Sequence, residues 1–227
     1  MKLIKFASVL EVIDMPKPSI KHIPEWYKKT KTIANAGVAS VYDEVTFKRC
    51  IPFVDSMTSG YIIELWSDIE IKIINGNYEI FWKDKEFNPM SFKTDNSIGL
   101  MPVPVGYSNK VFSFNHHLYI KTPKNYSLLF TQPLNRFDLP FYAMSGIVDT
   151  DIEPMFPGGY PLFIKEGFEG VIEKGTPILQ VIPIKRDSWK SVRSKKTQNE
   201  GRLTFQKAGL YISSWYKKNA WSKKKYE

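Results

Sequence analysis

Short apolar runs separated by turn residues recur along most of the chain. Ile69, Ile71 and Ile73 alternate with polar residues, which is the period of a half-buried strand. The sequence Asn-Gly-Asn at 75–77 follows, and it suits a hairpin turn because asparagine and glycine tolerate positive φ. This pattern predicts strands over residues 61–65, 69–74 and 78–82.

The second half of the chain repeats the pattern of short apolar runs. Proline, glycine and asparagine separate the runs, as expected at the bends of a compact β protein. We therefore predict a mainly β fold, a single antiparallel β-sandwich or β-clip-like domain with few short helices and a C-terminal helix. The predicted strands here are 111–114, 118–120, 127–131, 141–148, 160–164 and 178–184.

The rest of the chain gives weaker patterns. Residues 2–14 suit a first strand, and the proline at position 24 favours a helical turn over 23–29. Two periods fit 47–61 equally badly. We slightly prefer a helix over 50–59 that turns Ile51, Val54 and either Met57 or Thr58 inward. We expect loops over 30–46 and 84–110, a flexible polar stretch over 190–200, and a helix over 203–221.

The composition is that of a globular protein. The chain has 227 residues, of which 43% are hydrophobic and 15% aromatic. Cys50 is the single cysteine, so no internal disulfide can form, and no apolar run approaches the ~20 residues of a membrane helix. The N-terminal sequence lacks the features of a signal peptide. These observations predict a cytoplasmic protein, in the host cell if a phage encodes it, with no membrane partner.

The positive charge lies at one end of the chain. Residues 190–227, which we call the basic segment, contain eleven lysines and arginines and two acidic residues, and so carry the whole formal net charge of +9. The remainder is neutral. We expect a β domain over 1–189 and an aromatic-rich basic tail over 190–227.

Aromatic residues are interleaved with these cations, among them Trp189, Trp215 and Trp221. Such a mixture can bind phosphate backbones and stack on bases, or bind an acidic protein surface. The alternative is a helix that packs its aromatic residues on the β domain and leaves its lysines in water. For the first alternative, the candidate polyanion-binding residues are Lys195, Lys196, Lys217, Lys218, Lys223, Lys224 and Lys225.

Polar residues within apolar surroundings mark a candidate pocket. If residues 148–152 are extended, Asp149 and Asp151 point to the same side and could share a cation or face nucleotide-bound Mg²⁺. The alternative is that they cap free amide groups at a strand end. Asn135, Arg136 and Asp138 complete this candidate pocket, although such residues also often fix loops by hydrogen bonds.

A second candidate cluster contains Asp55, Thr58 and Tyr61 together with His116 and His117. The two histidines are adjacent, so on a strand they point to opposite faces and do not readily bind one metal ion. No spacing of histidine or cysteine suggests a metal site. We therefore predict no metal and no cofactor, except Mg²⁺ if the protein acts on nucleotides. We predict that Cys50 is a small core residue rather than a nucleophile.

Two blocks resemble an uncharacterised protein family of marine tailed phages and some bacteria. The first is Lys48–Tyr61, KRCIPFVDSMTSGY. The second runs from Thr122 through LFTQPLNR (129–136) and SGIVDTD (145–151) to GTPILQVIPIKR (175–186). This resemblance implies a phage-like origin and no particular activity.

A shorter likeness runs to the dUTPase and dCTP deaminase group of β-clip enzymes. It rests on GIVDTD (146–151), FEG (168–170), IEKG (172–175) and ILQV (178–181). In that group the aspartate region meets deoxyribose, and the hairpin that follows shapes a trimeric core. This chain departs from the group because Ile152 stands where the group has tyrosine, and neither a serine-rich phosphate motif nor a glycine-rich C-terminal motif is present.

Two functions follow from these observations. The first is an uncharacterised phage-type β protein that acts as a binding or assembly module, alone as a homo-oligomer or with a protein partner, and whose basic segment contacts nucleic acid or another acidic surface. The alternative is a nucleotide-acting enzyme with a pocket near Asp149 and Asp151. The sequence does not decide whether the protein is an enzyme.

Overall fold

The computed structural model describes residues 2–8, 10–34, 46–83, 86–152, 159–210 and 215–227. The chain divides into two compact units. The first contains residues 1–24, 57–186 and 226–227, and the second contains residues 25–56 and 187–225. The basic segment belongs to the second unit except for its last two residues.

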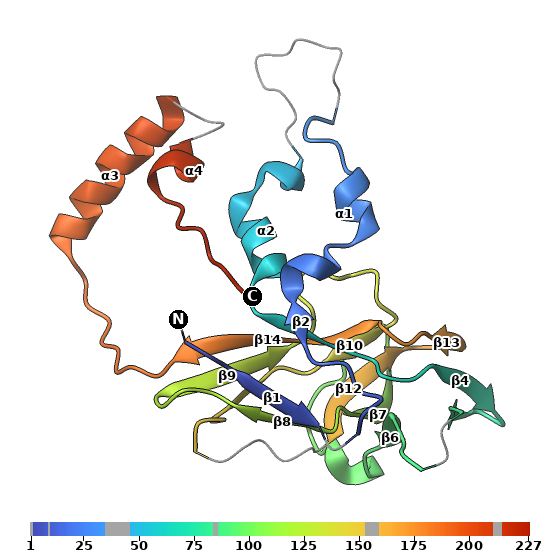
Figure 1. Cartoon of the computed structure of the whole chain (residues 1–227). Coiled ribbons are helices and arrows are strands. Elements are labelled where there is room, and N and C mark those ends of the chain that lie inside the picture. The colour runs from blue at the N-terminus through green and yellow to red at the C-terminus, as the bar shows by residue number, and fades with distance from the viewer. Residues whose placement is uncertain (1, 9, 35–45, 84–85, 153–158, 211–214) are drawn as a thin grey trace. The chain divides into compact units, whose positions relative to one another are not determined.

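The described part of the chain is mainly β, as the sequence predicted, with fourteen strands in four antiparallel sheets and no closed barrel (Figure 1). The strands are β1 (Lys5–Ser8), β2 (Lys17–Pro18), β3 (Tyr61–Glu64), β4 (Ile69–Ile74), β5 (Asn77–Phe81), β6 (Met90–Phe92), β7 (Tyr107–Asn115), β8 (Leu118–Lys121), β9 (Tyr126–Thr131), β10 (Phe141–Ala143), β11 (Gly146–Val148), β12 (Gly159–Lys165), β13 (Gly170–Ile172) and β14 (Pro177–Lys185).

Two larger sheets build the first unit. One has the strand order β10-β12-β7-β6, and the other has the order β11-β9-β14-β3-β2. Smaller sheets are formed by β13-β4-β5 and by β1-β8. The predicted hairpin is present, since β4 and β5 pair around the turn at Asn75 and Gly76, both with positive φ. In this pair Ile71 lies opposite Ile80.

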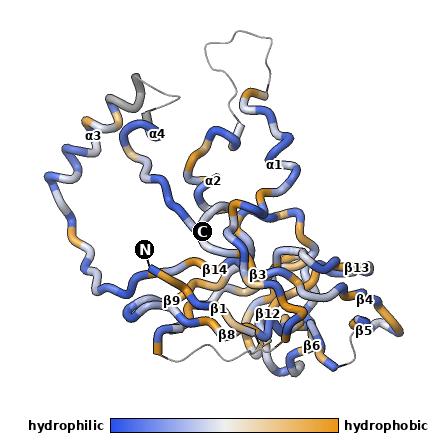
Figure 2. The backbone as a smooth tube through the Cα atoms, in the orientation of Figure 1, coloured by the Kyte–Doolittle hydropathy of each residue, from blue (hydrophilic) through white to orange (hydrophobic). Residues whose placement is uncertain are grey.

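Residues of both larger sheets contribute to one hydrophobic core. Phe112 and Leu162 come from the four-stranded sheet, and Phe130 and Leu179 come from the five-stranded sheet, all at most 1% exposed. The rings of Phe130 and Tyr160 stack with centroids 5.5 Å apart, which joins the two sheets directly. Figure 2 shows these strands in mixed and hydrophobic colours, while α3 and α4 are largely hydrophilic.

The helices are few and short. They are α1 (Glu25–Lys29), α2 (Ile51–Thr58), α3 (Lys195–Leu210) and α4 (Trp215–Asn219), with 3-10 helices at Ser19–His22, Phe47–Arg49 and Asp95–Ser97. The preferred helix over 50–59 is confirmed as α2, but only Met57 of its predicted inward residues is buried. In the second unit Tyr27 of α1 stacks on Phe53 of α2, with centroids 6.2 Å apart.

Several element predictions were wrong in detail. The predicted strand 141–148 is two strands, β10 and β11, which belong to different sheets. The first strand covers only Lys5–Ser8, and β6 lies within the predicted loop 84–110. The stretch 190–200 is not wholly irregular, because α3 begins at Lys195 and is followed by α4. Most of the predicted loop 30–46 lies outside the described residues. Cys50, predicted to be a small core residue, is exposed.

Candidate functional site

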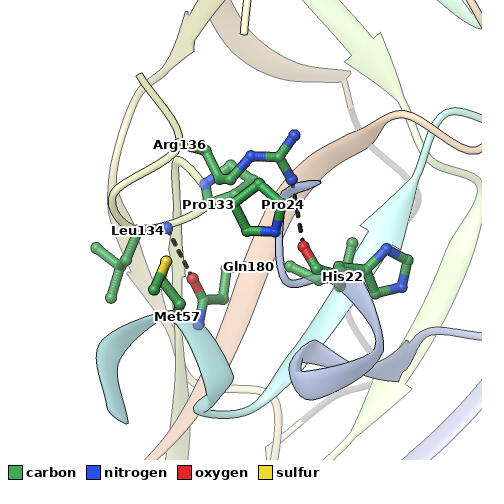
Figure 3. A pocket seen from close by; sticks show the side chains of 8 residues that line it. His22, Pro24, Met57, Pro133, Leu134, Arg136 and Gln180 are labelled. Atoms are coloured by element: carbon green, nitrogen blue, oxygen red, sulfur yellow. Dashed lines mark hydrogen bonds between the residues drawn. The ribbon is translucent and has the colours of Figure 1, made fainter. Parts of the chain in front are cut away.

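Arg136 lines a small cavity in the first unit, together with His22, Met57, Leu134 and Gln180 (Figure 3). The guanidinium of Arg136 forms a bidentate pair with Asp138, with Nε 2.9 Å from Oδ1 and Nη2 2.8 Å from Oδ2. Its Nη1 also donates to the backbone oxygen of His22, at 3.4 Å. Arg136 therefore ties the loop after β9 to the 3-10 helix near the N-terminus.

Gln180 of β14 forms another wall of this cavity and is only 1% exposed. Its Oε1 accepts the backbone N–H of Leu134 at 2.8 Å, and its Nε2 donates to the backbone oxygen of Ser59 at 2.6 Å. The cavity measures about 10 Å³, which is room for roughly one water molecule. These contacts hold two loops against the sheet.

His22 connects the same region to an ion pair. Its Nε2 lies 3.5 Å from Glu64 Oε1, while Lys17 Nζ lies 2.8 Å from the other oxygen of that carboxylate. Burial lowers the pKa of His22, and the hydrogen bond to Glu64 raises the pKa of Lys17. Sequence reasoning did not group these three residues, because they come from separate stretches of chain without a shared motif.

Asp149 and Asp151 form a separate cluster with Arg186, the residue after β14. Arg186 Nη1 lies 3.1 Å from Asp149 Oδ1 and 2.7 Å from Asp151 Oδ1. Asp149 also accepts the hydroxyl of Ser127 at 2.6 Å, and Asp151 accepts the backbone N–H of Asn125 at 2.8 Å. The hydrogen bond from Arg186 lowers the pKa of Asp151 to about 2. Both carboxylates thus form salt bridges with the guanidinium of Arg186.

The structure divides the five candidate pocket residues between these two places. Gln180, beside Arg136, lies in β14, and Arg186, beside Asp149, is six positions further on, just past the end of that strand. At ~3.3 Å per residue this is roughly 20 Å. Asn135 has a positive φ of 61° in the loop that carries Arg136. Sequence reasoning did not single out Arg186, because it lies 35 positions from Asp151 and shares no motif with it.

The second candidate cluster is also divided. Asp55 belongs to the second unit, where its Oδ2 accepts Trp221 Nε1 at 2.8 Å and pairs with the ammonium of Lys224. Thr58, Tyr61 and the two histidines belong to the first unit. Tyr61 donates to the backbone oxygen of Glu227 at 3.2 Å. Asp55 is thus an anchor for the end of the basic segment.

The two histidines lie at the turn between β7 and β8. His116 is fully buried, and its Nδ1 accepts the backbone N–H of Leu118 at 3.0 Å. Burial lowers its pKa to about 4. His117 has a φ of 48° and meets Trp66 edge-on, with ring centroids 5.8 Å apart. Within the described residues, no group of three or more histidine, cysteine, aspartate or glutamate side chains could hold a metal ion.

The basic segment presents its described side chains to solvent. Every residue of α3 from Lys195 to Gln206 is exposed, and so are the proposed polyanion-binding lysines on and after α4. Large apolar side chains of α3 are also exposed, Phe205 at 80% and Leu203 at 58%, and so is Trp189, at 89%, the residue before the basic segment. Trp221, by contrast, is half-buried against Asp55.

Comparisons with known proteins are sparse. No family model matches the sequence, and no curated protein matches it, so the resemblance to a marine phage family stays a prediction. One solved structure that matches is a D95N mutant dUTPase from phage phi11 of S. aureus, which coordinates a structural Mg(II) ion. It is 9% identical, covers 85% of this chain and 97% of that chain, and has a TM-score of 0.37. This likeness is too distant to assign an activity.

No helix in the described ranges is both long and apolar enough to cross a membrane.

Proposed function

We propose that the protein is a binding or assembly module whose basic segment contacts a polyanionic partner. The observation that carries this proposal is the exposure of α3 in a segment that holds the whole formal net charge of +9. Eleven cations in one segment attract a polyanion by release of its counterions, and this attraction weakens steeply as salt is added.

The contacts of the candidate carboxylates favour binding over catalysis. Asp149 and Asp151 are paired with Arg186, and Arg136 is paired with Asp138. A nucleotide or its metal ion would have to displace these intramolecular partners. The cavity beside Arg136 has a volume of about 10 Å³, far below the ~300 Å³ of small ligand sites.

The test compares two variants with equal loss of charge. In one, Lys195, Lys196, Lys217 and Lys218 are changed to glutamine; in the other, Lys5, Lys83, Lys124 and Lys174, exposed lysines of the first unit, are changed in the same way. Binding of a short labelled DNA duplex is measured by fluorescence anisotropy over a salt series. We expect the first variant to bind more weakly, with a salt slope lower by up to about 0.9 per lost phosphate contact. Equal weakening in both variants would reject a localised site.

The nucleotide-acting alternative has its own test. A ligand at about 100 times its Kd stabilises the folded state by about 2.7 kcal/mol, which a thermal-shift assay detects. The assay would use dUTP, dCTP and other nucleotides with Mg²⁺. The paired state of Asp149 and Asp151 leads us to expect no shift.

A homo-oligomer also stays a prediction, which the measured mass in solution at several concentrations would test.

A further inference from the structure

One face of α3 combines an aromatic ring, a guanidinium and an open space. Gly201, Arg202, Phe205 and Gln206 line a shallow hollow on this helix. Their spacing of i, i+1, i+4 and i+5 places them on adjacent turns of one face. Phe205 is 80% exposed, so most of its ring surface is available to a ligand.

Gly201 keeps the hollow open. A helical side chain leans toward the N-terminus, so Phe205, one turn beyond Gly201, points toward the turn that contains Gly201 and Arg202. A Cβ added at Gly201 would meet no atom within 4 Å. Glycine in the middle of a helix costs about 1 kcal/mol relative to alanine. Here it leaves one side of the hollow without a side chain.

We propose that this face of α3 is a base-stacking platform for single-stranded nucleic acid, an inference that rests on the proposed function of the basic segment. A base has an apolar π-face that stacks on Phe205, and the guanidinium of Arg202 suits both a phosphate and a base face. The lysines at 195 and 196, at the start of the same helix, supply further charge for the backbone. Trp189, at 89% exposure, offers a second ring close in sequence.

Single strands fit this surface better than duplexes do. In a duplex the base faces are already stacked and paired, whereas in a single strand they are available to an aromatic side chain. Charge alone would attract either form. The exposed ring is therefore the feature that distinguishes the two ligands.

The test measures affinities of the full chain for a labelled single strand, a duplex of equal length, and an abasic strand with the same phosphates. Phe205→Ala should weaken single-strand binding about 5- to 150-fold, the range for loss of one stacked base, and should leave duplex and abasic-strand binding unchanged. Phe205→Tyr should restore single-strand affinity. Leu203→Ala removes another exposed apolar side chain of α3 and should have little effect.

Gly201→Leu gives an independent check, because it fills the hollow without changing charge. It should weaken single-strand binding. The helix content measured by circular dichroism should stay the same or rise, since leucine favours helices more than glycine does. If Phe205→Ala and Gly201→Leu leave single-strand binding unchanged, the platform is rejected and the charge-based function stands. If the unmodified chain binds none of the three ligands at low salt, nucleic acid is rejected as the partner. If the chain also fails to bind heparin and an acidic peptide, the proposed function is rejected as well.

Discussion

Gly60, two residues after the end of α2, packs closely against the backbone of β14. It has a φ of 71°, and a Cβ built on it would lie 2.0 Å from the backbone oxygen of Val181 in β14. Gly76, in the hairpin turn, has a similar φ of 78° but no atom within 4 Å of such a Cβ. Both glycines thus have a positive φ, but only at Gly60 would an added Cβ clash with a neighbouring strand.

The first prediction follows from this pair. Gly60→Ala adds a steric clash with a central strand to the cost of a left-handed conformation, so we expect a loss of stability on the order of 3 kcal/mol or more. Gly76→Ala carries only the conformational cost, about 1 to 2 kcal/mol. Urea unfolding of both variants measures the difference. Equal losses would show that the backbone of β14 moves away at little cost.

His116 provides a prediction about pH. It is neutral in the fold, with its pKa lowered to about 4 by burial, while in the unfolded chain its pKa is about 6.5. As the pH falls below about 6.5, the unfolded chain binds a proton that the folded chain does not. Stability should therefore decrease between pH 6.5 and 4, by up to about 3 kcal/mol from this residue.

The check compares the wild type with His116→Asn, whose side-chain oxygen can still accept the N–H of Leu118. The variant should lose less stability than the wild type on going from pH 7 to 5 in urea titrations. His22 contributes in the same direction in both proteins, because burial lowers its pKa too. An unchanged pH slope in the variant would mean that His116 binds a proton as readily in the folded chain as in the unfolded chain.

Among the elements, the sequence predicted those strands in which apolar and polar residues alternate within the strand itself. The alternation over 69–74 located β4 to the residue. Residues 141–148 form one apolar run, but they are divided between two sheets, and the backbone N–H of Met144 bonds to Pro161 at the point where they separate. A period of two residues states which side chains share a face; it does not state which sheet a strand joins.

The same limit applies to α3 and to Arg186. Residues 195–202 are mostly polar and show no apolar period, so the start of α3 was missed even though lysine and glutamine favour helices. Arg186 and Asp151 are 35 positions apart, and only the pairing of β14 with β9 and of β9 with β11 brings them together. Partners of this kind follow from topology, which the sequence pattern did not contain.

The end of the basic segment supplies a prediction for an element. Tyr226 meets the ring of Tyr61 edge-on, with centroids 5.9 Å apart, and Tyr61 also binds the backbone of Glu227. Both contacts lie within the first unit. Tyr226→Ala should cost about 1 kcal/mol, typical of an aromatic pair, and should speed tryptic cleavage in the basic segment. Tyr216→Ala, on α4 and 43% exposed, is the control. Equal cleavage rates in the two variants would argue against an anchor at Tyr226.

For the whole molecule, the distribution of burial predicts an uneven stability. The first unit contains the hydrophobic core of both larger sheets, whereas α3 exposes every described side chain. Most helical stability in proteins comes from packing of one face, and a 16-residue helix with a central glycine is marginal without it. The amides of α3 should therefore exchange with solvent much faster than those of β7, β9 and β14.

Binding of a partner should slow the exchange of the α3 amides and leave that of the core strands unchanged. A partner that covers α3 stabilises the helix by mass action, so its amides should become protected when single-stranded nucleic acid is added, while those of the core strands stay as they were. Hydrogen exchange followed by mass spectrometry measures both states. If α3 is already as protected as β14 without a ligand, then its helix is stable on its own. In that case, protection gained elsewhere on addition of the strand would place the binding surface outside α3.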